Sequence, residues 1–319
     1  MTESDSPENS CKYGSNLAHV FHEGYFAVAI ELSPPLGPNR GYIERQIEQI
    51  RGYGDAYNVT SNQSARVHIA SLPVCIMLKQ AGLDPVYQIT CRDYNRLSMQ
   101  ANLLGASLHN IKTVFAISGD HMITGDHPHV KSVYDIDSIN LIRMIRMMRD
   151  EQVFENGKTI PRIAPDFFIG AAINPFAPPY DFRVMRLAKK VAAGVQFVQS
   201  QLVFNVPRFK EYMARVVDLG LHEKVAIMAG IGPARSQRAI EYMAYEIPGL
   251  DVPEWVLKRM QGLSKEDQAK AGFDISLEII QQVREIEGVR GIHLMPINWT
   301  QIVPELVTQL GLYPRPICS

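Results

Sequence analysis

The stretch AVAIELSPPLGPNRGYIERQIEQIRGYG, residues 27–54, contains the structural unit that the rest of the chain repeats. It begins with a short apolar run typical of a buried strand. After a Pro-rich turn it continues as a segment of helical period that ends at Gly54, a plausible helix cap. A strand followed by a crossover helix predicts a parallel sheet covered by helices.

The same alternation recurs to the end of the chain. It predicts strands at residues 26–33, 56–60, 86–91, 113–119, 167–174, 196–204, 224–231 and 291–297. Helical segments are expected at 42–54, 69–82, 95–108, 138–151, 182–194, 207–220, 236–247 and 300–311, with an insertion at 253–272 and another helix at 275–288. Eight successive units favour an α/β fold of the (β/α)8 TIM-barrel type over an open doubly wound sheet. We expect one barrel domain over residues 24–319, preceded by a polar tail over residues 1–23.

Composition and charge limit the possible functions. The chain has 319 residues, of which 46% are hydrophobic, and its 32 Lys and Arg nearly balance 33 Asp and Glu. With the charges balanced, the chain has no net positive electrostatic field that would attract a polyanion, so we expect no nucleic-acid partner. The polar start predicts neither a signal peptide nor a membrane anchor. Cys11, Cys75, Cys91 and Cys318 form no CxxC pair, which suits a reducing cytoplasm.

Polar residues interrupt the apolar runs where the predicted strands end. They are Glu31, Asn58, Thr60, Asn62, Gln88, Thr90, Ser118, Asp120, Asn174, Gln199, Gln201 and Asn298. In a (β/α)8 barrel these positions meet at the catalytic rim. Helix capping could explain any one of them, but it does not readily explain all of them.

Two carboxylates at this rim should differ in protonation. Glu31 ends an apolar run and precedes two prolines, so desolvation should raise its pKa and keep a proton on it, as a general acid requires. Asp120 follows Gly119 and precedes a long polar loop that should keep it ionised. A buried Glu31 in a structural hydrogen-bond network is the other interpretation.

Motifs for metals and nucleotides are weak. His127 and His129 have the spacing of some metal sites, but a convincing third ligand is missing, so we expect no metal. Lys189 and Lys190 could bind an anionic cofactor group or could be solvated charges at a helix end. No GxGxxG or GxxxxGK[ST] motif follows a strand, so a nucleotide cofactor would have to use the barrel rim.

Seven ordered motifs carry a family resemblance. They are ELSPP (31–35), NVTSNQ (58–63), QITCRD (88–93), AISGDH (116–121), AAINPF (171–176), KKVAAGVQFVQSQLVF (189–204) and IMAGIGP (227–233). Together they resemble the methylenetetrahydrofolate reductase family, a group of flavin-containing (β/α)8 barrels, over about residues 24–314. The resemblance is closest to the short bacterial type of acetogen one-carbon pathways.

The resemblance implies a reaction. Reduced flavin would pass hydride to 5,10-methylenetetrahydrofolate, with Glu31 as the proton donor and Asp120 stabilising the iminium cation, to give 5-methyltetrahydrofolate. FAD is favoured and FMN left open, and the electron donor would be NAD(P)H or a source delivered by a partner, such as an accessory electron-transfer subunit. A homo-oligomer or hetero-oligomer in the cytoplasm is expected.

The resemblance also assigns binding residues. Cofactor contacts are expected at Thr60, Asn62, Gln88, Ser118, Gly119, Asp120, Tyr134, Asn174 and Lys190, and folate contacts at Asp120 and Gln201. The chain departs from the family's common residues at Gln88, Ser118, Asn174 and Trp299, which leaves the flavin's phosphate contacts open.

Two other functions fit a polar barrel rim. A flavin-free methyltransferase barrel that passes a folate methyl group to a corrinoid protein would also need Asp, Asn and Gln for pterin recognition. A non-catalytic subunit of a methyl-transfer complex is the other alternative, and the presence of both Glu31 and Asp120 argues against it.

Overall fold

The computed structural model describes residues 14–317, and its centre is a closed barrel of eight parallel strands in sequence order. The strands are β1 Ala27–Leu32, β2 Ala56–Val59, β3 Pro85–Thr90, β4 Thr113–Ile117, β5 Phe168–Ile173, β6 Phe197–Leu202, β7 Ala226–Ile231 and β8 Val289–Leu294. β8 pairs with β1, which closes the sheet. The (β/α)8 barrel and the positions of its eight strands are as the sequence predicts.

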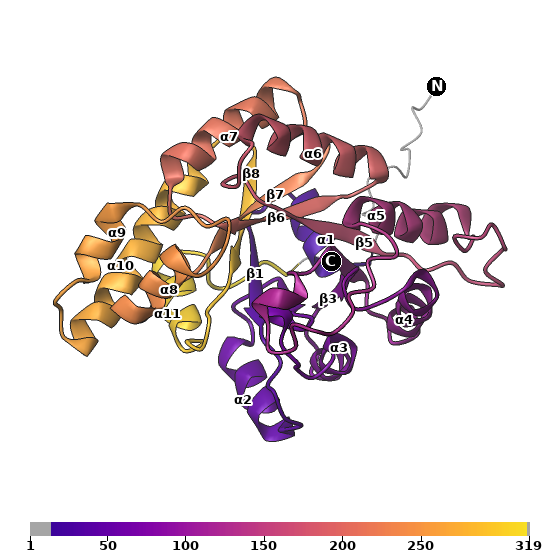
Figure 1. Ribbon diagram of the computed structural model, residues 1–319, viewed down its shortest axis with the longest axis horizontal. Helices are drawn as coiled ribbons and strands as arrows, with labels where there is room; N and C mark the ends of the chain where they lie inside the picture. The colour runs from indigo at the N-terminus through magenta and orange to yellow at the C-terminus, as the bar shows by residue number, and fades with distance from the viewer. Residues whose placement is uncertain (1–13, 318–319) are drawn as a thin grey trace, which may run out of the picture.

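Helices surround the barrel (Figure 1). They are α2 Arg40–Ile50, α3 Ser71–Gln80, α4 Arg96–Leu108, α5 Ser138–Arg146, α6 Tyr180–Ala193, α7 Val206–Asp218, α8 Gln237–Tyr245, α9 Glu254–Met260, α10 Lys265–Arg284 and α11 Ile302–Gln309. Short helical turns follow β2 (η1, Gln63–Ala65) and β4 (η2, Met122–Thr124). No helix within residues 14–317 is long and apolar enough to cross a membrane.

The two-residue period of β1 determines which side chains enter the barrel. Val28 and Ile30 pack outward in the core shared with the helices, whereas Ala27 and Ala29 belong to a second core inside the barrel. Because alternate residues of a strand share a face, Glu31 is the third inward residue. The strand therefore brings its carboxyl group to the end of the barrel where the strands terminate.

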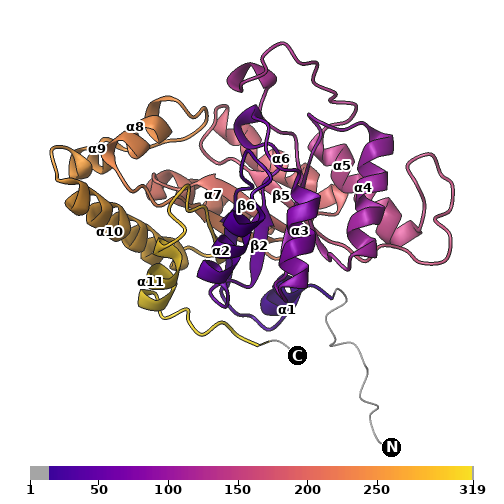
Figure 2. The ribbon, with the colours of Figure 1, turned by 90° about the horizontal axis from the view of Figure 1, so that it is seen from below.

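The end of the barrel where the strands begin is closed by a helix that the sequence did not predict. α1, Asn16–His22, lies under the barrel (Figure 2) and buries Leu17 and Phe21 against inward residues of the strands. The Ser15 hydroxyl caps it and bonds the Thr113 hydroxyl at 2.6 Å. The expected tail over residues 1–23 is therefore wrong for residues 16–22, because these apolar side chains fill the barrel's lower opening; residues 1–13 lie outside the described residues.

The insertion after β7 also differs from the expectation. α10 begins at Lys265, ten residues before the predicted helix at 275–288, and so includes the end of the segment read as an insertion. Ser264 accepts a hydrogen bond from the backbone of Asp267, and Glu266 lies in the first turn. These are the signals of a helix start.

Candidate active site

Two cavities open where the strands end, and Glu31 lines both. The larger, of about 740 Å³, is lined by residues from most of the strand ends, among them Glu31, Gln88, Asp120, Lys190, Gln201 and His293. The smaller, of about 450 Å³, lies beside β1, α2 and the loop after β8, and is lined by residues that include Glu31, Ser33, Tyr42, Gln46, Asn298 and Thr300. We call them the mouth cavity and the side cavity.

The mouth cavity rests on a polar pair that crosses the barrel. The amide groups of Asn58 on β2 and Gln199 on β6 exchange two hydrogen bonds, of 2.7 and 3.1 Å, and both residues are buried. Gly170 gives the Phe197 ring room beneath them, because a Cβ there would lie 2.2 Å from that ring. A satisfied buried amide pair makes a rigid floor.

Glu31 reaches the mouth cavity from β1 with 16% of its side chain exposed. Burial raises the pKa of this carboxyl from 4.5 to about 7. The described residues donate no hydrogen bond to this carboxyl group, so nothing offsets its desolvation, and Glu31 keeps its proton to a higher pH than an exposed glutamate does. The protonation expected from the sequence thus has a structural cause.

His293 on β8 is the titratable neighbour of Glu31 that the sequence reading missed. Its Nε2 lies 3.8 Å from Glu31 Oε2, beyond hydrogen-bond distance, and has no partner among the described residues. Burial lowers the pKa of His293 to about 3. The imidazole is therefore neutral beside a glutamic acid, and no ion pair forms.

Asp120 lies at the exposed rim of the same mouth cavity. Gly119 before it has φ +83°, the left-handed region that favours glycine, and a Cβ there would lie 3.0 Å from Arg92 Cβ. Within residues 14–317 the Asp120 carboxylate has no hydrogen-bond partner, while its backbone carbonyl accepts from Arg92 Nη1 at 3.2 Å. The loop thus holds the backbone and leaves the carboxylate available to a ligand.

Arg92 joins three loops of the rim, and sequence reasoning missed it as well. Its side chain is 2% exposed, and its guanidinium group pairs with Asp93, which follows β3, at 2.7 Å. It also donates to the carbonyl of Asn62, after β2, and to that of Asp120, after β4. A planar guanidinium can satisfy several acceptors at once, so Arg92 fixes these loops to one another.

Three cations of α6 line the mouth cavity. Lys190 is buried, donates to the Ala172 carbonyl at 2.5 Å, and has a pKa lowered to about 8 by burial and then by Arg186. Arg183 and Arg186 line the cavity as well, although the sequence reading did not select them. Arg186 follows Arg183 by three residues and precedes Lys190 by four, so all three lie on one helix face. This spacing is the sequence signal that could have identified the two arginines.

Most of the remaining expected residues also face the mouth cavity. Its lining includes Thr60, Asn62, Gln88, Ser118, Asn174 and Gln201. The Asn174 amide is already engaged, since it donates to the Gly249 carbonyl and accepts from the Phe176 backbone. Tyr134 lines neither cavity; its hydroxyl lies 3.4 Å from the carbonyls of Gly119 and Asp120.

The loop after β4 does not assemble a metal site. His127 bonds Asp126 at 2.8 Å on the surface. Among the residues that the structure describes, no group of three or more His, Cys, Asp or Glu side chains could hold a metal ion.

Comparison with known proteins gives one family. The family model described as methylenetetrahydrofolate reductase matches residues 16–311. A probable methylenetetrahydrofolate reductase (NADPH) of Caenorhabditis elegans is 26% identical over 74% of this chain, which spans 34% of that longer protein. The 5,10-methylenetetrahydrofolate reductases of Pectobacterium carotovorum and Escherichia coli are each 21% identical, over 81% and 74% of this chain and 79% and 73% of their own lengths.

A solved structure shares the fold. It is a Clostridium thermocellum protein that binds two copies of 5-methyl-5,6,7,8-tetrahydrofolic acid, with a TM-score of 0.63 and 15% sequence identity. The similarity covers 89% of this chain and 93% of that one.

Proposed function

Since the chain belongs to the methylenetetrahydrofolate reductase family, we propose that its mouth cavity reduces 5,10-methylenetetrahydrofolate to 5-methyltetrahydrofolate. The observation that carries the proposal is the pairing of unlike carboxyl groups in one cavity. Glu31 is desolvated and retains a proton near neutrality, whereas Asp120 lies at the exposed rim. Two acids in different environments can take the roles of proton donor and electrostatic stabiliser.

In this proposal Glu31 donates its proton to N10 of the folate. The bond from N10 to the bridging carbon breaks, its electron pair stays on N10, and an N5 iminium cation remains. The Asp120 carboxylate stabilises that cation until hydride addition to the carbon completes the methyl group. A preorganised charge of this kind contributes about 10²–10³ to a rate.

A flavin supplies the hydride when it is bound. The mouth cavity fits such a group: its volume of about 740 Å³ is in the range of cofactor sites. Arg183, Arg186 and Lys190 form a cationic wall suited to a phosphate or pyrophosphate. We assign the ring and ribityl contacts to a wider set of rim residues: Thr60, Asn62, Gln88, Ser118, Gly119, Asp120 and Asn174, with Tyr134 supporting the loop. FAD is the proposed form.

The folate would use the rest of the rim. The Gln201 side chain lines the mouth cavity, and its oxygen accepts from the Leu202 backbone at 3.0 Å, which leaves its amide hydrogens for a pterin. Binding of 5-methyltetrahydrofolic acid by a Clostridium thermocellum protein of the same fold supports a folate at such a barrel. The proposed electron donor is NAD(P)H or a source delivered by a partner protein. The proposed location is the cytoplasm, and the proposed active form is an oligomer.

One anaerobic experiment tests this function. Purified protein, loaded with FAD or FMN, is mixed with NADH, NADPH or reduced ferredoxin, and methylenetetrahydrofolate is then added. Bleaching of the flavin absorbance by one donor, followed by its recovery with stoichiometric methyltetrahydrofolate, is the expected result. A protein that binds no flavin yet transfers a folate methyl group to a corrinoid protein would instead be the methyltransferase.

A further inference from the structure

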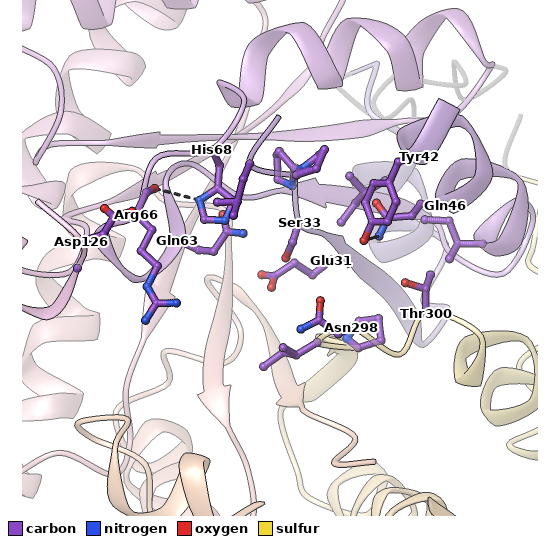
Figure 3. Close-up of a pocket in the computed structure, with 18 residues that line it drawn as sticks. Glu31, Ser33, Tyr42, Gln46, Gln63, Arg66, His68, Asp126, Asn298 and Thr300 are labelled. Carbon is purple, nitrogen blue, oxygen red and sulfur yellow. Dashed lines mark hydrogen bonds between the residues drawn. The ribbon is translucent and has the colours of Figure 1, made fainter. Parts of the chain in front are cut away.

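The side cavity gives Glu31 a second face that the folate need not cover. Figure 3 shows Glu31 between Ser33 and Asn298, with Tyr42, Gln46 and Thr300 to one side of it. Thr300, Tyr42 and Gln46 line only the side cavity. The mouth cavity and the side cavity therefore share a wall, and Glu31 is one of the residues that form it.

Gln46, which lines the side cavity, has a polar atom that lacks a partner. Gln46 Oε1 is buried without a hydrogen bond from any described residue, although its Nε2 donates to the Tyr42 hydroxyl at 3.0 Å. Buried polar groups of this kind are normally satisfied by protein or by ordered water. A cavity of about 450 Å³ with several polar groups has the room and the partners that water needs.

The reaction requires a proton that the described neighbours of Glu31 do not supply. Each turnover transfers the Glu31 proton to folate, so the carboxylate must be protonated again. His293 is a titratable neighbour of Glu31, at 3.8 Å, but burial keeps that imidazole neutral, with a pKa of about 3. Asp126 lines the side cavity and not the mouth cavity, and it is exposed, so the side cavity opens to solvent there.

We propose that the side cavity holds the water that returns a proton to Glu31 while folate occupies the mouth cavity. The proposal rests on the proposed function. The proton comes from solvent: an O–H bond of hydronium at the outer end breaks, protons shift along the water chain, and an O–H bond forms on Glu31. One proton is taken up from solvent for each proton that Glu31 gives to the folate, so no other reactant is needed.

Two substitutions confined to the side cavity test the proposal. Gln46→Leu removes the amide that orients the water at nearly constant size, and Thr300→Phe fills the cavity. Gln49→Leu on the same helix is the matched control, because Gln49 lines neither cavity. Gln46 is half-buried, so its variant should fold even if Thr300→Phe does not.

The first turnover separates proton donation from proton return. Reduced enzyme is mixed rapidly with methylenetetrahydrofolate and excess donor. In both side-cavity variants we expect one product per site at the wild-type rate, followed by a steady state slowed at least about tenfold, as loss of a proton-transfer step commonly costs. The solvent deuterium isotope effect on that steady state should rise, while the folate Kd and the flavin reduction rate stay unchanged. Gln49→Leu should behave as wild type.

Infrared difference spectroscopy gives a readout without turnover. With methyltetrahydrofolate bound, deuterium exchange at the protonated Glu31 carboxyl should be slower in Gln46→Leu than in Gln49→Leu. An unchanged steady state and exchange rate in Gln46→Leu would overturn the water route. A weakened folate Kd would also overturn it, since the cavity would then hold part of the substrate. Absence of folate reduction in the wild-type protein would instead refute the proposed function.

Discussion

Glu31 Oε2 and His293 Nε2 lie 3.8 Å apart as two neutral groups, because burial raises the pKa of the acid to about 7 and lowers that of the imidazole to about 3. An ion pair would have lowered the pKa of Glu31 and removed its proton at neutral pH. In the register of β1 with β8, Ala29 pairs with His293. This register puts the side chains of Glu31 and His293 close together but not within hydrogen-bond distance.

His293→Gln tests whether this pair is neutral. Glutamine keeps a polar side chain of similar size and carries no charge. We therefore expect the midpoint of the alkaline limb, in the pH–rate profile of folate reduction, to stay within about half a pH unit of wild type. The pH profile of the single-turnover folate reaction measures it. A limb displaced upward by more than a unit would mean that a charged His293 had been lowering the pKa of Glu31.

Glu31→Gln should separate the two halves of the reaction. Glutamine cannot donate the proton to N10, so folate reduction should fall by about 10²–10⁴, while flavin reduction by the electron donor stays near wild type. Rapid mixing with each substrate alone measures both rates. The exposed Glu44→Gln on α2 is the control for a changed glutamate outside the cavities. Methyltetrahydrofolate formation at the wild-type rate would remove Glu31 from the mechanism.

The pKa of Glu31 also predicts a pH dependence of stability. The folded-state pKa of about 7 exceeds the usual 4.5, so the native state holds this proton more tightly than the unfolded chain. The stability that this provides is complete below pH 4.5 and is lost as pH rises through about 7. Glu31→Gln should therefore match wild type at low pH and exceed its free energy of unfolding above pH 7 by up to about 3 kcal/mol.

Denaturant titrations at several pH values measure this difference. A constant difference between wild type and Glu31→Gln across the range would show that the carboxyl is not desolvated in the folded protein.

Asp120→Asn should weaken the stabilisation of positive charge. The amide keeps the shape and removes the charge, so we expect the folate half-reaction to slow by about 10²–10³. Folding should be unaffected, since Asp120 is exposed and its backbone, not its carboxylate, is held by Arg92. Asp218→Asn, at the exposed end of α7, is the matched control. Equal folate reduction rates in the two variants would assign Asp120 no electrostatic role.

Arg92→Leu should destabilise the rim. It leaves Asp93 partly buried without its cation, and breaking such a pair commonly costs about 3 kcal/mol or more. Arg40→Leu removes the cation of the exposed Arg40–Glu44 pair and should cost less than about 1 kcal/mol. Urea unfolding compares the two. Folate reduction should fall in Arg92→Leu as well, because the Asp120 loop loses its hydrogen bond to Arg92. Similar losses of stability in Arg92→Leu and Arg40→Leu would contradict the role of Arg92 in stabilising the rim.

The fold was largely predictable from local pattern. Strand and helix periods, glycine caps and eight repeated units were enough to predict the barrel. α1 was missed because its seven residues make a helix only where Leu17 and Phe21 can pack inside the lower opening. The early start of α10 was missed because its first turns are polar, so its apolar period begins only later in the segment.

By itself, the sequence determined that Glu31 and Asp120 stand at strand ends, since a two-residue period and a following polar loop are local properties. Only the tertiary structure decided how much water each one loses, that Arg92 links three loops, that His293 lies beside Glu31, and that Glu31 lines a second cavity. The physical reason is that desolvation and contacts between strands depend on residues far apart in the chain, which are brought together when the barrel closes.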